Sequence, residues 1–447
     1  MDPIMNERPI HKLTSLERIG PKGYLRYIFP FQLQEDYDLD EVIRVLQAGY
    51  QALTHLIPEV ACEAVPGGTR IVVKDLRASF ESDYAELKDK SFPVASFDAD
   101  TFCPRSVWPS AGERLPISVV QANFIHGGLI LTWCILYMVG DGTTFFTWTN
   151  IWAEECRRAQ GLGILDPMQL PEAIWQDREQ VTKPSGHNAG KLEDHPEYSL
   201  LPFTPQGAPP KMTSLNHRGH VFYFSPESLA ALKAEASPVN VTEPTDQKWI
   251  WTNDALAALL WRTVMAVQSP LETLEGDPVS FFNIAIDGRQ RTDPELHPAS
   301  LGCFLEYVSV SASIRKMLST MNLADLATEI RKVILRADGR FTDDVLALVE
   351  QLEDVDRLVP TVFLDVPGFN CVLTSSVNLK LYGLEWGPLL GNNIEAVRVP
   401  HVGCINGCQV VLPVLPSGGI EILVGVEESC LDRLLNDPLF TKYGVAR

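Results

Sequence analysis

The chain has 447 residues, 45% of them hydrophobic, which is enough to bury a large core in two or more domains. The formal net charge is −20, and no dense Lys/Arg cluster opposes it, which argues against nucleic acid and anionic membranes as partners. The apolar run from 127 to 140 is too short to span a membrane, and no secretory signal is visible. We therefore expect a soluble, cytoplasmic protein.

The 9 cysteines are scattered along the chain, which predicts free thiols and no disulfide framework. Cys404 and Cys408 are close in sequence, but no second Cys/His pair lies near them with metal-ligand spacing. We therefore predict no metal site.

Strand and helix patterns alternate along the N-terminal part of the chain. The longest apolar run, Gly127 to Thr144, predicts a buried strand that breaks at Gly140-Asp141-Gly142 and turns into a helix. Asp141 or Thr143 is placed to cap that helix. We predict strands at 24–33, 69–73, 116–125 and 129–138, and helices at 38–56, 84–89 and 143–160.

Residues 181–211 are rich in Pro, Gly and polar residues and have no sustained period, so we predict a linker between domains at 1–180 and 212–447. Mixed α/β domains that meet at an interface commonly place a small-molecule site there. Strands are predicted at 219–224, 279–286, 302–313, 371–377, 407–413 and 420–425, and helices at 226–235, 255–268, 322–336, 342–352 and 427–443.

Several short stretches, in order along nearly the whole chain, carry a family resemblance. Residues 121–129 (QANFIHGGL) lead to Asp141-Gly142, and Asp287-Gly288-Arg289 is followed by Leu301-Gly302. Glu385-Trp386-Gly387 comes later, before the ending at 418–437. In this pattern the chain resembles the BAHD acyltransferases, particularly their fungal trichothecene acetyltransferase-like branch.

The resemblance implies an α/β fold of two chloramphenicol-acetyltransferase-like domains with a channel between them. Family members move an acyl group from CoA to an alcohol or amine, with a His as base in a His-x-x-x-Asp-Gly motif. The motif Asp is structural and pairs with an Arg, which Arg289 matches best here. Acyl-CoA is the implied co-substrate, with no tightly bound cofactor, and a small hydrophobic natural product is the implied acceptor. We expect a monomeric enzyme of specialised metabolism.

Tyr137 stands four residues before Asp141, where the family motif has its His. A histidine titrates near pH 6.5 and a tyrosine near pH 10, so roughly one tyrosine in a thousand is ionised at pH 7. A neutral phenol is a hydrogen-bond donor and a poor general base.

Three interpretations follow from this substitution. In the first, the chain is an acyltransferase in which a neighbour activates Tyr137, another residue supplies the base, or proximity suffices, most easily for an amine. In the second, the channel hosts a CoA-independent cyclisation, rearrangement or proton transfer, and Tyr137 donates a hydrogen bond to a carbonyl or enolate oxygen. In the third, the protein is a catalytically inactive binding protein.

For some candidate residues the sequence allows two roles. For His297 and for Ser375 and Ser376, a structural role competes with a catalytic one, and Trp386 fits the core at least as well as a channel wall. His401 is expected to be structural or exposed. The catalytic candidates are Tyr137, Ser375, Ser376 and His297; the structural motif is Asp141, Gly142, Arg289, Glu385, Trp386 and Gly387; the channel candidates are Trp133, Ile135 and Cys303.

Overall fold

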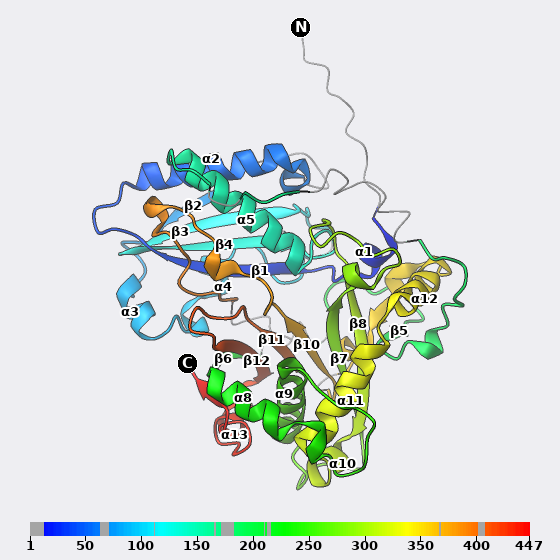
Figure 1. Ribbon diagram of the computed structural model, residues 1–447. Coiled ribbons are helices and arrows are strands. Elements are labelled where there is room, and N and C mark those ends of the chain that lie inside the picture. The colour runs from blue at the N-terminus through cyan, green and yellow to red at the C-terminus, as the bar shows by residue number, and fades with distance from the viewer. Residues whose placement is uncertain are drawn as a thin grey trace.

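Two β-sheets organise the chain into an upper and a lower α/β body (Figure 1). The structure is a computed structural model, and it describes residues 13–62, 71–110, 112–164, 167–170, 183–209, 211, 216–365, 368–400 and 407–447. His401, Cys404 and residues 181, 182 and 210 of the predicted linker lie outside the described residues.

The upper body is built on a four-stranded sheet in the order β1-β4-β3-β2. β4 runs antiparallel to both β1 and β3, and β2 runs parallel to β3. Helices α2 and α5 pack on the face of this sheet that points away from the lower body (Figure 1). The bounds are α1 Ser15–Ile19, β1 Tyr24–Gln32, α2 Leu39–Leu56, β2 Val72–Asp75, α3 Tyr84–Asp89, α4 Ala99–Phe102, β3 Ser118–Ile125, β4 Gly128–Leu136 and α5 Gly142–Ala159.

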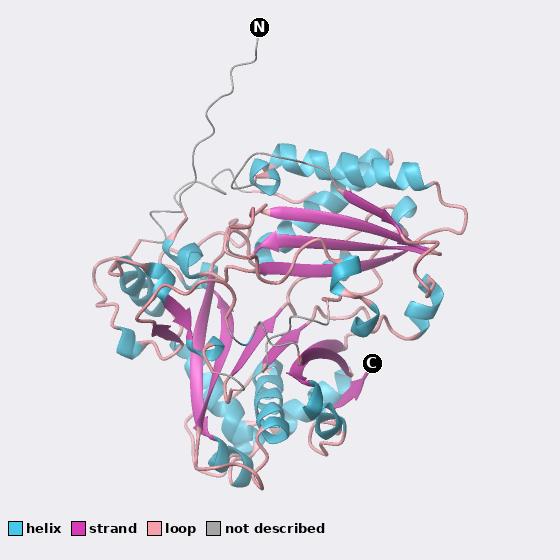
Figure 2. Cartoon of the chain, turned by 180° about the vertical axis from the view of Figure 1, so that it is seen from behind, coloured by secondary structure: helices cyan, strands magenta, loops and turns pink. Residues whose placement is uncertain are grey.

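The lower body is built on a seven-stranded sheet in the order β13-β6-β12-β11-β10-β7-β8. Seen from behind, its strands run steeply across the direction of the upper sheet (Figure 2). The bounds are β6 His217–Phe224, α8 Pro226–Glu235, α9 Thr252–Gln268, β7 Val279–Asp287, β8 Leu305–Ser313, α10 Ile314–Ser319, α11 Leu323–Arg336, α12 Gly339–Glu350, β10 Cys371–Ser375, β11 Cys408–Val411, β12 Ile420–Glu427, α13 Leu431–Leu435 and β13 Gly444–Ala446.

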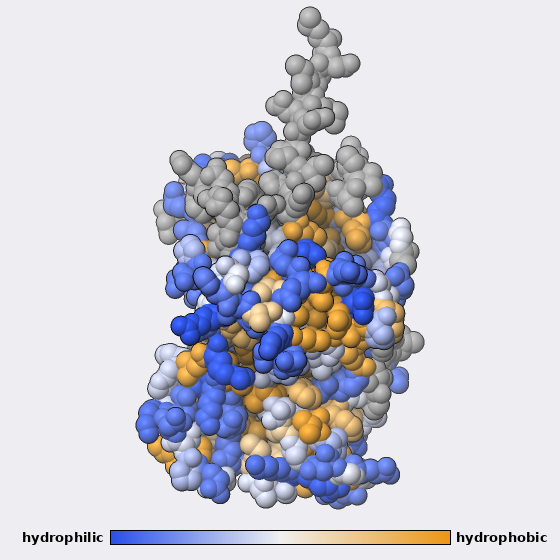
Figure 3. All heavy atoms as spheres, turned by 90° about the vertical axis from the view of Figure 1, so that its right-hand side faces the viewer, coloured by the Kyte–Doolittle hydropathy of each residue, from blue (hydrophilic) through white to orange (hydrophobic). Residues whose placement is uncertain are grey.

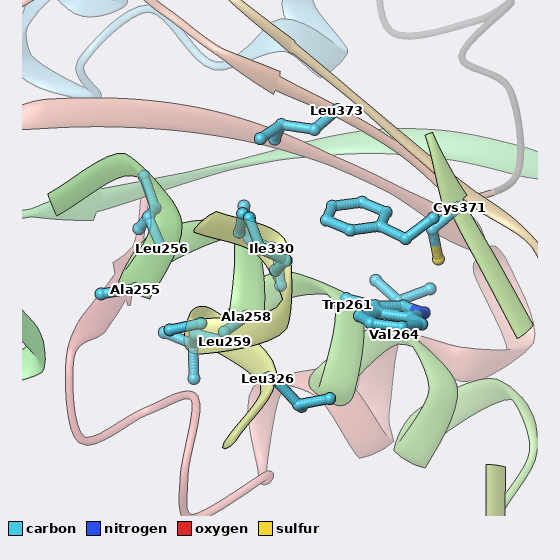
Figure 4. Close-up of a cluster of buried hydrophobic side chains, with 14 of the residues drawn as sticks. Ala255, Leu256, Ala258, Leu259, Trp261, Val264, Leu326, Ile330, Cys371 and Leu373 are labelled. Atoms are coloured by element: carbon cyan, nitrogen blue, oxygen red, sulfur yellow. The ribbon is translucent and has the colours of Figure 1, made fainter. Parts of the chain in front are cut away.

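The core of the lower body lies between this sheet and helices α9 and α11 (Figure 4). Trp261 of α9 stacks on Phe282 of β7, with ring centroids 5.3 Å apart. Its indole N–H donates to Ser280, 2.8 Å away, so the one polar atom of this buried ring has a partner.

The C-terminal half also supplies part of the upper core. Leu381, Trp386 and Val397 are buried in the same apolar cluster as α2 and α5. Arg398 forms a bridge to Ile28 of β1, with N–O distances of 2.8 and 3.0 Å. The two bodies are therefore held together by a segment that leaves the lower sheet and returns to it.

The predicted elements agree with the structure in type and differ mainly at their ends. Inside the predicted linker 181–211, a short strand β5 (Tyr198–Leu200) pairs antiparallel with β9 (Leu358–Pro360). The helix predicted at 427–443 is shorter, and β13 follows it. No helix within the described residues is long and apolar enough to cross a membrane.

Candidate active site

A cavity of about 650 Å³ lies between the two bodies. Both bodies contribute side chains to it, and apolar and aromatic groups dominate its wall. On the molecular surface, apolar side chains also gather near the middle of the face on the right of Figure 1 (Figure 3). Among the residues that line the cavity are Tyr27, Trp108, Tyr137, Phe146, Tyr307 and Ser376.

Tyr137 lies in this wall, directly after β4 ends at Leu136. Its backbone N–H donates to the carbonyl of Gly23, 2.9 Å away, which holds the residue in the turn. Burial raises the pKa of Tyr137 well above its ordinary value, and the nearby Cys303 and Tyr307 add to the shift. The phenol is therefore neutral at physiological pH, and a neutral phenol is able to donate a hydrogen bond.

Two further tyrosines of the wall were missed in the sequence. The Tyr27 hydroxyl lies 2.6 Å from that of Ser376, and burial raises the pKa of Tyr27. Tyr307 also has its pKa raised by burial. Tyr27 sits in an apolar strand whose sequence resembles core, so no local signal marks it. The cavity is thus lined by neutral hydroxyl groups.

Ser375 and Ser376 both line the cavity, as expected for catalytic candidates. The Ser375 residue is exposed, and Ser376 is buried against Tyr27.

Asp141 and Arg289 form a buried ion pair, and both residues also line the cavity. Two hydrogen bonds of 2.6 and 3.0 Å join the guanidinium to the carboxylate, which also accepts from the N–H groups of Thr144 and Phe304. Asp141 is the N-cap of α5 and Gly142 its first residue. The predicted Asp–Arg pairing is present, and it fixes the turn that carries Tyr137.

Glu385, Trp386 and Gly387 serve the fold and do not line the cavity. Trp386 is fully buried in the upper core, where it packs edge-on against the Trp152 ring at 5.3 Å. Glu385 is exposed and pairs with Arg157 at 2.8 Å. Gly387 has a φ of 88°, a conformation that favours glycine.

The expectation that Trp133, Ile135 and Cys303 line the channel is wrong. Trp133 and Ile135 are fully buried on the face of β4 that packs against α2 and α5. Cys303 is also fully buried and is not part of the cavity wall. Alternation of side chains along a strand would put Trp133, Ile135 and Tyr137 on one face, but β4 ends at Leu136 and the turn redirects the side chain of Tyr137.

His297 is not part of the cavity wall either, which corrects its candidacy as a base. Its side chain is exposed, and its Nδ1 accepts from the Ala299 N–H at 3.1 Å, although Pro298 and Ala299 do line the cavity. Among the residues that the structure describes, no histidine lines the cavity.

Comparisons with known proteins support the same architecture. Residues 24–156 match the family model described as Trichothecene 3-O-acetyltransferase-like N-terminal domain. The chain is 27% identical over 408 residues to the eremophilane O-acetyltransferase prx11 of Penicillium rubens, covering 85% of this chain and 82% of that protein. It is 26% identical over 458 residues to the enoyl-CoA isomerase/hydratase claC of Penicillium crustosum, covering 97% of this chain. The chain spans 50% of the length of claC.

Solved structures show the same fold. TRI101 of F. graminearum, in complex with coenzyme A and T-2 mycotoxin, aligns with a TM-score of 0.82 at 22% identity, covering 97% of this chain and 98% of that chain. Vinorine synthase aligns with a TM-score of 0.69 at 15% identity, covering 99% and 95%. The chain therefore has the two-domain BAHD-like fold, and in sequence it is similar to trichothecene 3-O-acetyltransferase-like N-terminal domains and to fungal acyltransferases.

Proposed function

We propose that the protein transfers an acyl group from acyl-CoA to a small, largely apolar acceptor bound in the inter-body cavity. The similarity to fungal acyltransferases supports acyl transfer, and TRI101, which shares the fold, was crystallised with coenzyme A and a mycotoxin. The apolar and aromatic wall suits an uncharged natural product.

The neutral Tyr137 hydroxyl in the cavity wall carries the mechanistic part of the proposal. A half-buried donor in a cavity wall stabilises negative charge as it develops on the thioester carbonyl oxygen. The ion pair of Asp141 and Arg289 holds the turn in place, so the donor does not have to reorganise during the reaction.

The preferred acceptor is an amine. A neutral amine attacks the thioester carbon through its lone pair, whereas an alcohol has first to lose its proton to a base. When the C–S bond breaks, the proton of the new ammonium passes to the thiolate leaving group, which yields an amide and free CoA. Proximity in the cavity supplies a further part of the rate.

A second candidate is a CoA-independent cyclisation, rearrangement or proton transfer. The observation that favours it is that hydroxyl donors line the cavity while no histidine does so among the described residues. Tyr137 then donates to a carbonyl or enolate oxygen of a single bound substrate.

Coenzyme A binding separates the two candidates. Calorimetric titration of the purified protein with CoA and acetyl-CoA, followed by a thiol-release assay on a panel of apolar amines and alcohols, tests the proposal directly. Saturable binding with amine-dependent release of CoA supports acyl transfer. Absence of binding refutes it in favour of the second candidate.

Tyr137→Phe, with Tyr84→Phe as the matched control, then tests the role of the hydroxyl. Tyr84 is buried in the upper body, its hydroxyl has no hydrogen-bond partner among the described residues, and it is not part of the cavity wall. We expect turnover to fall roughly 10- to 1,000-fold in the first variant and to be unchanged in the second.

A further inference from the structure

Two cysteine thiols face each other beneath the upper sheet, on the side opposite α2 and α5. Cys134 lies in β4, between β1 and β3, and Cys103 directly follows α4. Their sulfur atoms are 3.5 Å apart. Cys134 is fully buried, and Cys103 is 7% exposed. Both residues are therefore buried, and Cys103 is the less deeply buried of the two.

The surroundings make the two thiols chemically unequal. The hydrogen bond from Cys134 and the positive charge of Arg26 lower the pKa of Cys103. Burial raises the pKa of Cys134 well above its ordinary value. Cys103 is therefore the thiol that ionises more readily to the reactive thiolate, and Cys134 is the one that keeps its proton.

Cys103 also begins a segment that forms part of the cavity wall. Val107 and Trp108 line the cavity, and the Val107 carbonyl accepts from the Tyr24 N–H at 2.7 Å. A covalent link between Cys103 and β4 would fix the start of this segment. A disulfide needs sulfur atoms about 2.05 Å apart, so the two sulfurs have to approach by roughly 1.5 Å, and Cys103 lies outside regular structure, where such a shift is small.

We propose that Cys103 and Cys134 form a redox-active dithiol that a hydroperoxide converts to a disulfide, which tethers residues 103–108 of the cavity wall to β4. In the first step the Cys103 thiolate attacks the peroxide O–O bond, giving a sulfenic acid and hydroxide. In the second, the Cys134 sulfur attacks the sulfenic sulfur, the S–O bond breaks, and the Cys134 proton leaves with the oxygen as water. Overall, two thiols and one hydrogen peroxide give one disulfide and two waters.

The experiment treats the full-length protein with hydrogen peroxide, denatures it in iodoacetamide and maps the cysteines by mass spectrometry. We expect the peptides of Cys103 and Cys134 to appear joined, with a loss of 2 Da, and dithiothreitol to separate them again. Cys156, a fully buried thiol in the upper core, is expected to be alkylated as in the untreated protein.

Two variants make the test specific. In Cys134→Ala, Cys103 is expected to stop at the sulfenic or sulfinic acid and to react roughly tenfold more slowly, because the hydrogen bond that lowers its pKa is gone. In Cys430→Ser, the matched control outside this pair, the link is expected to form as in the wild type. Full alkylation of Cys103 and Cys134 after peroxide treatment of the wild type, or a link to a different cysteine, would overturn the proposal.

Discussion

Replacing Asp141 by Asn removes the charge that balances a buried arginine. In the wild type, Oδ1 accepts from Arg289 and from the Thr144 N–H, and Oδ2 accepts from Arg289 and from the Phe304 N–H, all at 2.6–3.0 Å. An asparagine keeps one oxygen and turns its NH₂ group towards the other two donors. Two hydrogen bonds are lost, and one of them is charge-assisted.

The loss of stability in Asp141→Asn follows from the burial of Arg289. The Arg289 side chain is 1% exposed, so water cannot replace the lost partner. Breaking one side of a buried ion pair costs about 3–5 kcal/mol of the free energy of unfolding. Asp287→Asn is the matched control, because Asp287 bonds the same guanidinium at 3.0 Å while its side chain is 45% exposed. For this exposed partner we expect a cost of about 0–1 kcal/mol.

Equilibrium unfolding in urea, followed by tryptophan fluorescence and by circular dichroism, measures both variants against the wild type. The reasoning predicts a large loss for Asp141→Asn and a small one for Asp287→Asn. Equal losses in the two variants, or a loss below 1 kcal/mol for Asp141→Asn, would refute the assignment of Asp141 as the buried anchor of the turn.

Three further predictions concern other parts of the chain. Burial raises the pKa of Glu306 from 4.5 to about 7, so the folded state holds a proton that the unfolded state releases. The wild type should therefore lose about 3 kcal/mol between pH 4.5 and 7, and Glu306→Gln should not; parallel pH profiles of unfolding would contradict this. His297→Ala should leave turnover unchanged, since the imidazole is exposed and off the cavity wall; a large loss of kcat would reinstate it as a catalytic group. Gly387→Ala should cost about 1–3 kcal/mol, because φ is 88° and a methyl group would meet the Gln160 amide; an unchanged urea midpoint would argue against strain there.

The strand, turn and helix around Asp141 could be predicted from sequence because their signals are local. The apolar run ends at Gly140-Asp141-Gly142, and an aspartate before a helical period is a capping signal. The partner of Asp141 could not be predicted from a local signal. Arg289 lies 148 residues away, and the family resemblance, not any local pattern, pointed to it.

The cavity wall could not be predicted in the same way. Side chains alternate between the two faces only while a strand continues. Because β4 ends before Tyr137, the position of Tyr137 at the cavity does not carry over to Trp133 and Ile135, which lie on the opposite, core-facing side. Tyr27 and Ser376 meet across 349 residues, a contact that tertiary packing alone creates. Local sequence patterns therefore predict the helices and strands, whereas the residues that line the cavity are identified only in the folded structure.

The most direct test of the account measures the single-turnover rate of acyl transfer for the wild type and Tyr137→Phe, together with CoA affinity for both. If the Tyr137 hydroxyl is the donor in the cavity, the rate falls roughly 10- to 1,000-fold while CoA affinity is unchanged. An unchanged rate in Tyr137→Phe would contradict the account and remove this hydroxyl from the mechanism.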